Sequence, residues 1–256
     1  MKNLFDLTGK VAVVTGSTKG IGRSIAEALA RAGASVIISS RNQDACDEVA
    51  SAILNDGLEA LPIACHIGKK EDLERLVAET KKHYGKIDCL VCNAAVNPYY
   101  GPLAKMPDEA FTKIIDSNVR SCLLLCNLVI PDMAKRRDGS VIVVSSIAGL
   151  KGSLNLGMYA ISKAADMQLV RNLAVEWGPK NVRVNCIAPG LVRTDFARAL
   201  WENPELLASA EANYPLRRIG EPDDIGGAAV FFASRAGNWT TGQTLVIDGG
   251  ATIVGI

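Results

Sequence analysis

The sequence predicts an α/β protein in which helices cover both faces of a doubly wound, seven-stranded parallel sheet. Two observations carry this prediction. Short apolar segments alternate with segments of helical periodicity along the whole chain. Most of the apolar segments are nearly continuous in apolar residues, as strands buried on both faces are. No linker or change of composition interrupts the alternation over residues 1–256, so we expect a single domain.

The predicted elements follow one another in a regular order. The strands share short, apolar, β-branched sequences: Val11–Thr15, Ser35–Ser39, Glu59–Cys65, Ile87–Cys92, Ser140–Ser145, Val182–Ile187 and Thr244–Ile247. The helices share an amphipathic repeat: Ile21–Arg31, Gln43–Asn55, Glu71–Tyr84, Glu109–Lys135, Tyr159–Trp177 and Asp223–Ser234. Leu191–Arg218 breaks the alternation, and an excursion of this length is more often a functional lid than a connection. We expect residues 191–218 to cover the carboxyl edge of the sheet, where ligands bind in such folds.

Composition excludes several classes of function. The chain has 48% hydrophobic and 21% charged residues and a formal net charge of +1, without a long Lys/Arg run for binding nucleic acid. The N-terminus lacks the apolar core of a signal peptide and the apolar runs are too short to cross a bilayer, so we expect a cytoplasmic protein without a membrane partner.

The seven cysteines are expected to be reduced and mostly buried, because the count is odd and no secretion signal precedes them. Cys89 and Cys92 lie three apart in a predicted strand and therefore face opposite sides, which argues against a zinc or redox role. The chain has only two histidines, His66 and His83, so we expect no metal site.

A glycine-rich turn joins the first predicted strand to the first predicted helix. Such glycines let the backbone approach a pyrophosphate, and the helix N-terminus offers free N–H groups and a positive dipole end. We therefore expect a dinucleotide to contact Gly16, Ser17, Thr18, Lys19, Gly20, Ile21 and Gly22.

The end of the second predicted strand favours NADP(H) over NAD(H). Its sequence, Ser40-Arg41-Asn42, lacks the carboxylate that would bind a ribose 2′-hydroxyl and offers an arginine that pairs with a 2′-phosphate. Lys19 can reach the same region from the glycine turn.

Tyr159 and Lys163 lie four residues apart in a predicted helix and therefore share one face. A lysine cation beside a phenol favours the phenolate and provides an acid–base group near neutral pH. Alone, such a pair is more often an ordinary surface pair, but the glycine turn and Arg41 predict a nicotinamide beside it.

The chain resembles the short-chain dehydrogenase/reductase family along its whole length. The family's T-G-x-x-x-G-x-G motif matches Thr15–Gly22, and its serine and Tyr-x-x-x-Lys motif matches Ser146, Tyr159 and Lys163. The family's helical asparagine, proline–glycine turn with a following threonine, and closing glycines match Asn118, Pro189-Gly190, Thr194 and Asp248-Gly249-Gly250. The resemblance implies a single Rossmann-like domain.

The resemblance also implies roles for these residues. Tyr159 is expected to donate the proton to a carbonyl oxygen that Ser146 orients, while the nicotinamide supplies the hydride. Lys163 is expected to make the phenol more acidic and to hold the nicotinamide ribose, and Asn118 to support a water. Further cofactor contacts are implied for His66, Ile67, Asn93, Ala94, Ala95, Pro189, Gly190, Val192 and Thr194.

Two residues depart from the family pattern. Cys92 replaces an asparagine that usually stabilises the fourth strand, and His66 replaces the aspartate that usually meets the adenine. With Ser39–Arg41 and Asn93–Pro98, these variants are similar to the NADPH-dependent carbonyl and retinal reductases of the peroxisomal branch. The C-terminal residues differ from a Ser-Lys-Leu signal, so we expect a cytosolic relative.

We therefore expect an NADP(H)-dependent oxidoreductase that interconverts a ketone or aldehyde and its alcohol. An NAD-dependent secondary alcohol dehydrogenase is one alternative, which the relative affinity for NADPH and NADH distinguishes. A non-catalytic NADP-binding regulator is another, which the complete Asn118, Ser146, Tyr159 and Lys163 set disfavours.

The substrate is expected to be a small, hydrophobic carbonyl or alcohol compound. Its pocket is expected to include Ser146, Tyr159, Val96, Leu154, Leu191, Phe196 and Trp201. Four lid arginines, Arg193, Arg198, Arg217 and Arg218, leave room for one carboxylate. Residues Ser121–Ile130 are more apolar than a one-sided helix requires, and the family resemblance implies a homotetramer formed through such helices and the last strand.

Overall fold

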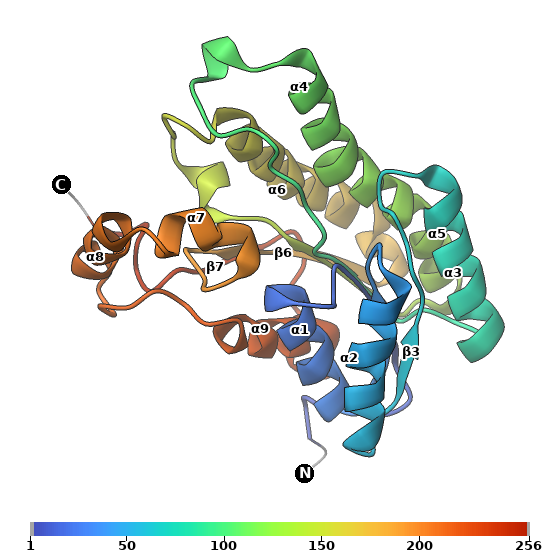
Figure 1. Cartoon of the computed structure of the whole chain (residues 1–256). Coiled ribbons are helices and arrows are strands. Elements are labelled where there is room, and N and C mark those ends of the chain that lie inside the picture. The colour runs from blue at the N-terminus through green and yellow to red at the C-terminus, as the bar shows by residue number, and fades with distance from the viewer. Residues whose placement is uncertain (1–2, 255–256) are drawn as a thin grey trace.

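The computed structural model describes residues 3–254 and contains a seven-stranded parallel sheet with helices on both faces (Figure 1). The strands are β1 (Val11–Thr15), β2 (Ser35–Ser39), β3 (Ala60–Pro62), β4 (Cys89–Cys92), β5 (Gly139–Val144), β6 (Val182–Pro189) and β7 (Thr244–Ile247). Their spatial order is β3-β2-β1-β4-β5-β6-β7, so the strand order reverses between β1 and β4. The predicted fold class is confirmed.

The helices form two layers. They are α1 (Gly20–Arg31), α2 (Gln43–Asn55), α3 (Lys70–Tyr84), α4 (Asp108–Ile114), α5 (Ser121–Arg136), α6 (Gly157–Trp177), α7 (Arg198–Trp201), α8 (Pro204–Asn213) and α9 (Asp223–Ala233). Helices α1, α2 and α9 contribute to the apolar core on one face of the sheet, and α3, α5 and α6 to the core on the other. Because alternate strand residues face opposite sides, Val13 enters one core and Val14 the other.

Two predicted elements differ from those observed. Strand β3 is shorter than predicted, because it lies at the sheet edge and ends at Pro62, which has no N–H to donate. The long helix predicted over 109–135 is interrupted by a π-helical segment, Ile115–Arg120, between α4 and α5. Such segments often mark functional positions, and this one contains Asn118.

The helical stretch Asp108–Arg136 passes a length and composition test for a membrane span, with 29 residues and a mean hydropathy of 1.3 in its most apolar window. Half of that window is buried in the molecule, where α5 packs on the sheet and on α3. The expectation that every apolar run is too short to cross a bilayer is wrong by this test. The burial of α5 on the sheet is typical of a helix in the core of a protein.

All seven cysteines are buried and reduced, as predicted. Cys89 and Cys92 enter the cores on opposite faces of the sheet, which confirms their predicted orientation. The structure also brings together Cys92, Cys122 and Cys126, whose Sγ atoms lie within 4.8 Å of one another. The i,i+4 spacing of Cys122 and Cys126 places these two on one face of α5, but only tertiary packing brings Cys92 of β4 to them.

Candidate active site

The glycine turn after β1 has a backbone that larger residues would disrupt. Gly16 and Gly20 have φ angles of +66° and +55°. A Cβ on Gly22 would lie 2.3 Å from the carbonyl oxygen of Gly16 and 2.4 Å from Nδ2 of Asn93. The turn therefore requires glycine for conformation at its first two positions and for space at the third.

The N-terminus of α1 is suited to bind an anion. Among the described residues, the backbone N–H groups of Thr18 through Gly22 donate to no protein acceptor. Lys19, the N-cap residue, makes no side-chain capping bond, and no acidic residue occupies the first turn. Free N–H groups at the positive end of a helix dipole fit the pyrophosphate of a dinucleotide.

Asn93 fixes the glycine turn to the end of β4. Its Nδ2 donates to the carbonyl oxygens of Thr15 (2.9 Å) and Gly16 (3.2 Å). In return, Oγ1 of Thr15 accepts the backbone N–H groups of Asn93 (3.0 Å) and Ala94 (3.1 Å). Half-buried Ala94 and Ala95 thus lie beside the turn, at the point where the strand order reverses.

Of the residues predicted to lie near a 2′-phosphate, one is free and the others already make contacts with the protein. Arg41 is exposed and forms no hydrogen bond or ion pair with any residue between 3 and 254. Asn42 caps α2 by accepting the N–H of Ala45 (3.0 Å), and Ser40 bonds locally to Asn42. Lys19 is engaged with the predicted lid (residues 191–218), since its Nζ lies 3.2 Å from Oδ2 of Asp195. Arg41 is therefore the cation that needs no rearrangement to meet a phosphate.

His66 is held by its own loop. Its Nδ1 accepts the N–H of Gly68 (3.1 Å), and its backbone N–H donates to Oδ2 of Asp72 (2.8 Å), which lowers the pKa of that carboxyl. Ile67 packs against the apolar core. Their contact with adenine stays a prediction.

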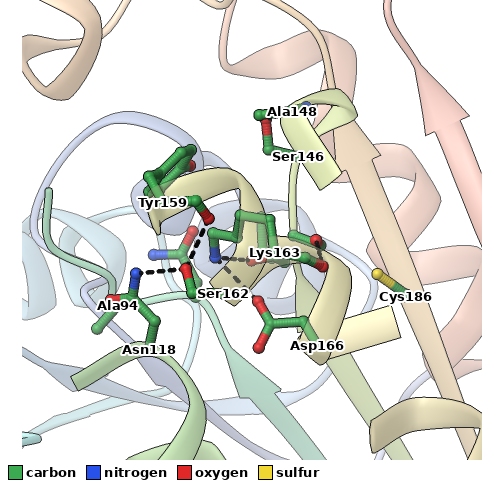
Figure 2. Close-up of polar contacts among 12 residues, drawn as sticks. Ala94, Asn118, Ser146, Ala148, Tyr159, Ser162, Lys163, Asp166 and Cys186 are labelled. Carbon is green, nitrogen blue, oxygen red and sulfur yellow. Dashed lines mark hydrogen bonds and ion pairs between the residues drawn. The ribbon is translucent and has the colours of Figure 1, made fainter. Parts of the chain in front are cut away.

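Helix α6 carries Tyr159 and Lys163, and Figure 2 shows them with Ser146 above Lys163. Nζ of Lys163 lies 5.7 Å from the centroid of the Tyr159 ring and donates to the carbonyl oxygen of Val144 (2.9 Å). Ser146 follows β5, and its Oγ accepts the N–H of Ala148 (3.1 Å). That bond leaves the hydroxyl proton of Ser146 free to donate to a ligand.

Asn118 connects the loop after β4 to α6. Its amide bonds both backbone polar groups of Val96, at 2.8 Å and 3.1 Å, and its Nδ2 also donates to Oγ of Ser162 (3.1 Å). This use of its side chain explains why a buried asparagine occupies the π-helical segment. The predicted role of Asn118 in supporting a water stays a prediction, and its side-chain amide is already engaged.

Asp166 is the functional candidate that sequence reasoning missed. Its Oδ2 lies 3.1 Å from Nζ of Lys163, and both side chains are almost completely buried (Figure 2). Burial raises the pKa of Asp166 to about 7 against the opposing pull of the ammonium. Burial lowers the pKa of Lys163, but Asp166 and the phenol of Tyr159 outweigh it, so the net pKa is raised. The i,i+3 spacing of a lysine and an aspartate was the available signal.

The lid begins directly over the glycine turn. A Cβ on Gly20 would meet Cγ2 of Thr194 at 3.0 Å, and Thr194 itself caps a 3₁₀ turn, Asp195–Ala197. Before it, Gly190 passes so close to Asp248 that a Cβ would lie 2.8 Å from its Cα. Val192 is buried and bridges to Gly220, which anchors this end of the lid.

The structure brings only some of the predicted substrate residues close to Tyr159. The ring of Phe196 lies 5.8 Å from that of Tyr159 and is 54% exposed. Trp201 donates from Nε1 to the carbonyl oxygen of Thr194 (2.8 Å), so its indole is used within the lid. Leu154 is 81% exposed on its loop. Val96 and Leu191, which are also predicted to line the substrate pocket, are half-buried.

The four lid arginines are all engaged, which corrects the expectation that they leave room for a carboxylate. Arg193 pairs with Glu221 (3.0 Å), Arg198 with Asp195 (2.7 Å) and Arg218 with Asp224 (2.6 Å). Arg217 donates to the carbonyl oxygen of Ala212. At Arg193, Arg198 and Arg218 an anionic substrate would compete with a carboxylate of the protein.

Comparisons with known proteins agree with this geometry. A family model described as enoyl-(acyl carrier protein) reductase matches residues 16–252. Dehydrogenase/reductase SDR family member 4 from Bos taurus is 46% identical over 245 residues, which cover 96% of this chain and 88% of the relative.

Solved structures share the fold over nearly the whole chain. A 7α-hydroxysteroid dehydrogenase complexed with NADH and 7-oxo glycochenodeoxycholic acid is 39% identical, with a TM-score of 0.94 and 98% coverage of both chains. A gluconate 5-dehydrogenase from Burkholderia cenocepacia, in complex with NADP and tartrate, is 28% identical with the same TM-score and coverage.

Fold and site together define a nucleotide-dependent oxidoreductase with a Rossmann-like sheet. Tyr159 and Lys163, its candidate acid–base pair, lie on one helix. The chain belongs to the short-chain dehydrogenase/reductase family, as the resemblance predicted.

Proposed function

We propose that this protein is an NADP(H)-dependent reductase that interconverts a hydrophobic ketone or aldehyde and its alcohol. The observation that carries the proposal is the pairing of Tyr159 and Lys163 on α6, with Ser146 across from them. A bound nicotinamide supplies the hydride in this chemistry. Tyr159 donates the proton to the carbonyl oxygen, the free hydroxyl proton of Ser146 orients that oxygen, and the cation of Lys163 favours the phenolate that results.

The state of Arg41 supports NADP(H) as the cofactor. Its guanidinium is exposed at the end of β2 and forms no ion pair with the described residues. A free guanidinium binds a 2′-phosphate through charge-assisted hydrogen bonds. The solved relative with NADH in its title keeps an NAD-dependent dehydrogenase as the second candidate.

The substitution Arg41→Asp is expected to reduce the preference for NADPH over NADH by roughly 10- to 100-fold, the equivalent of one lost charge-assisted contact. The measurement is the ratio of kcat/KM for the two cofactors with one carbonyl substrate. Arg23→Asp is the matched control, because Arg23 is an exposed arginine of α1 that pairs with Glu27. A ratio that Arg41→Asp leaves unchanged would remove the support for NADP(H).

The engaged lid arginines support a neutral substrate. We infer that aromatic and aliphatic ketones or aldehydes are reduced with a higher kcat/KM than keto acids of similar size. A panel of carbonyl compounds and alcohols, assayed with both nicotinamide cofactors, tests reaction, cofactor and substrate class together. Preference for the keto acids would contradict the inferred substrate, and no turnover of any compound would contradict the function.

We also propose a cytoplasmic homotetramer. Apolar side chains remain exposed on the two surfaces that the sequence singles out: Phe111 and Leu123 on the α4–α5 stretch, and Leu245 on β7. Such exposed apolar side chains are typical of subunit interfaces. Light scattering of the purified protein at micromolar concentration tests the assembly, and a monomer would contradict it.

A further inference from the structure

The buried ion pair between Lys163 and Asp166 lies one helical turn beyond the proposed proton donor. The Asp166 side chain is 1% exposed and the Lys163 side chain 4% exposed. Two buried charges are costly to desolvate, and a carboxylate is not required to hold a lysine in place when a backbone carbonyl already does so. Asp166 therefore needs an explanation beyond stability.

The contacts of the ammonium show what Asp166 does to Lys163. Of its three N–H donors, one reaches the carbonyl oxygen of Val144 and a second reaches Oδ2 of Asp166. Both acceptors belong to buried residues, and one donor remains for the phenol or a ligand. The side chain is thus held from two sides in a single position.

The carboxylate also changes the electric field at the phenol. An ammonium favours the phenolate of a neighbouring tyrosine, and an anion paired with that ammonium opposes the effect. Oδ1 of Asp166 has no hydrogen-bond partner among the described residues, so no second cation or donor compensates its charge. Besides Lys163, the ionisable groups that interact with Asp166 among the described residues are thiols: Cys122 raises its pKa, and Asp166 in turn raises the pKa values of Cys126 and Cys186 against other contributions.

Together with Tyr159, whose phenol acts on the pKa of Lys163, these groups come from α5, α6 and β6. They are Lys163 and Tyr159 on α6, Cys122 and Cys126 on α5, and Cys186 on β6. Burial keeps Cys186 a thiol, raising its pKa to about 12. Within this set, Lys163 is the single permanent cation and Asp166 the single carboxyl.

We propose that Asp166 is a positioning residue that tethers Lys163 and weakens the field of its ammonium at the phenol of Tyr159. The proposal rests on Tyr159 as the acid–base group of the proposed function. Removing the carboxylate leaves the ammonium unopposed, which makes the phenol more acidic. The pH range in which the protein reduces carbonyls then moves downward.

The test is a titration of the phenol in the cofactor-free protein, followed by the ultraviolet difference spectrum of tyrosinate. Subtracting the spectrum of the matching Tyr159→Phe protein isolates the signal of this residue from the other tyrosines. Asp166→Asn is expected to lower the titration midpoint by roughly one pH unit, a tenfold gain in acidity. The pH at which kcat/KM for carbonyl reduction falls on the alkaline side should move in the same direction by the same amount.

Matched variants separate charge from structure. Asp88→Asn removes another buried carboxyl, which is ion-paired with Lys86. Asp88 directly precedes β4 and so lies at the amino ends of the strands. It should leave the midpoint in place. Asp166→Glu, which keeps the charge, should restore the wild-type midpoint. If Asp166→Asn does not fold, Asp166→Leu serves as the neutral variant.

A midpoint that a folded neutral variant leaves unchanged, or raises, overturns the proposal. A midpoint that Asp88→Asn lowers equally also overturns it. Because the titration requires no turnover, it remains valid if the carbonyl panel fails. The failure of this proposal and the failure of the proposed function are therefore distinguishable.

Discussion

Tyr159→Phe is expected to reduce kcat for carbonyl reduction by at least about 1,000-fold, within the range that general acid catalysis contributes. Phenylalanine keeps the ring that lies 5.8 Å from Phe196 and loses only the hydroxyl. Binding of NADPH should change little, because the glycine turn and Arg41 are untouched. Steady-state kinetics and fluorescence titration with NADPH measure the two effects separately.

Tyr84→Phe is the matched control for this loss. Tyr84 ends α3, where it packs against the apolar core away from the glycine turn, and burial raises the pKa of its phenol. Its hydroxyl has no expected part in catalysis, so kcat should stay near that of the unmodified protein. Near-normal kcat in Tyr159→Phe would show that another group donates the proton.

The fold was largely predictable because local sequence and tertiary structure agree in this chain. β1, β2, α2 and β7 begin and end at the predicted residues. The errors occur where tertiary context decides. β3 is cut short at the sheet edge, and the long helix contains a π-helical segment that no periodicity distinguishes from an α-helix.

The site was predictable where a motif fixes the chemistry, and less so where side chains choose partners. Gly16, Gly20 and Gly22 have backbone reasons that spacing reveals. The pairing of Lys19 with Asp195 joins residues 19 and 195 and is visible only in the fold. The same holds for Arg193 and Glu221, which pair across 28 residues, whereas Asp195 and Arg198 have the i,i+3 spacing of helical neighbours.

Lys163→Met is expected to lower the free energy of unfolding by about 3–5 kcal/mol, the usual cost of removing one partner of a buried ion pair. Methionine fills the space of the lysine stem but leaves the Asp166 carboxylate without its counterion. The carboxyl of Asp166 must then be protonated in the folded state. Its pKa, already raised by burial, should rise further because the cation that opposed the rise is gone.

This raised pKa sets the sign of the pH dependence. A carboxyl whose pKa is higher in the folded than in the unfolded state binds more protons when folded. The contribution of this carboxyl to the stability of Lys163→Met, taken as the difference from the unmodified protein, should therefore be most favourable below about pH 4 and decrease as the pH rises through neutrality. Urea denaturation across that range, monitored by circular dichroism, measures the slope.

The double variant Lys163→Met, Asp166→Asn provides the decisive comparison. Asp166→Asn alone is expected to destabilise the protein, because it leaves the ammonium of Lys163 without a counterion. In the Lys163→Met background the same change removes a carboxyl that must bind a proton to stay buried, so it should stabilise the protein near neutral pH and flatten the pH dependence. Turnover should stay low in the double variant, because the cation beside Tyr159 is absent. Destabilisation of the same size in both backgrounds would show that the two charges are not coupled, and that their 3.1 Å contact contributes nothing to the site.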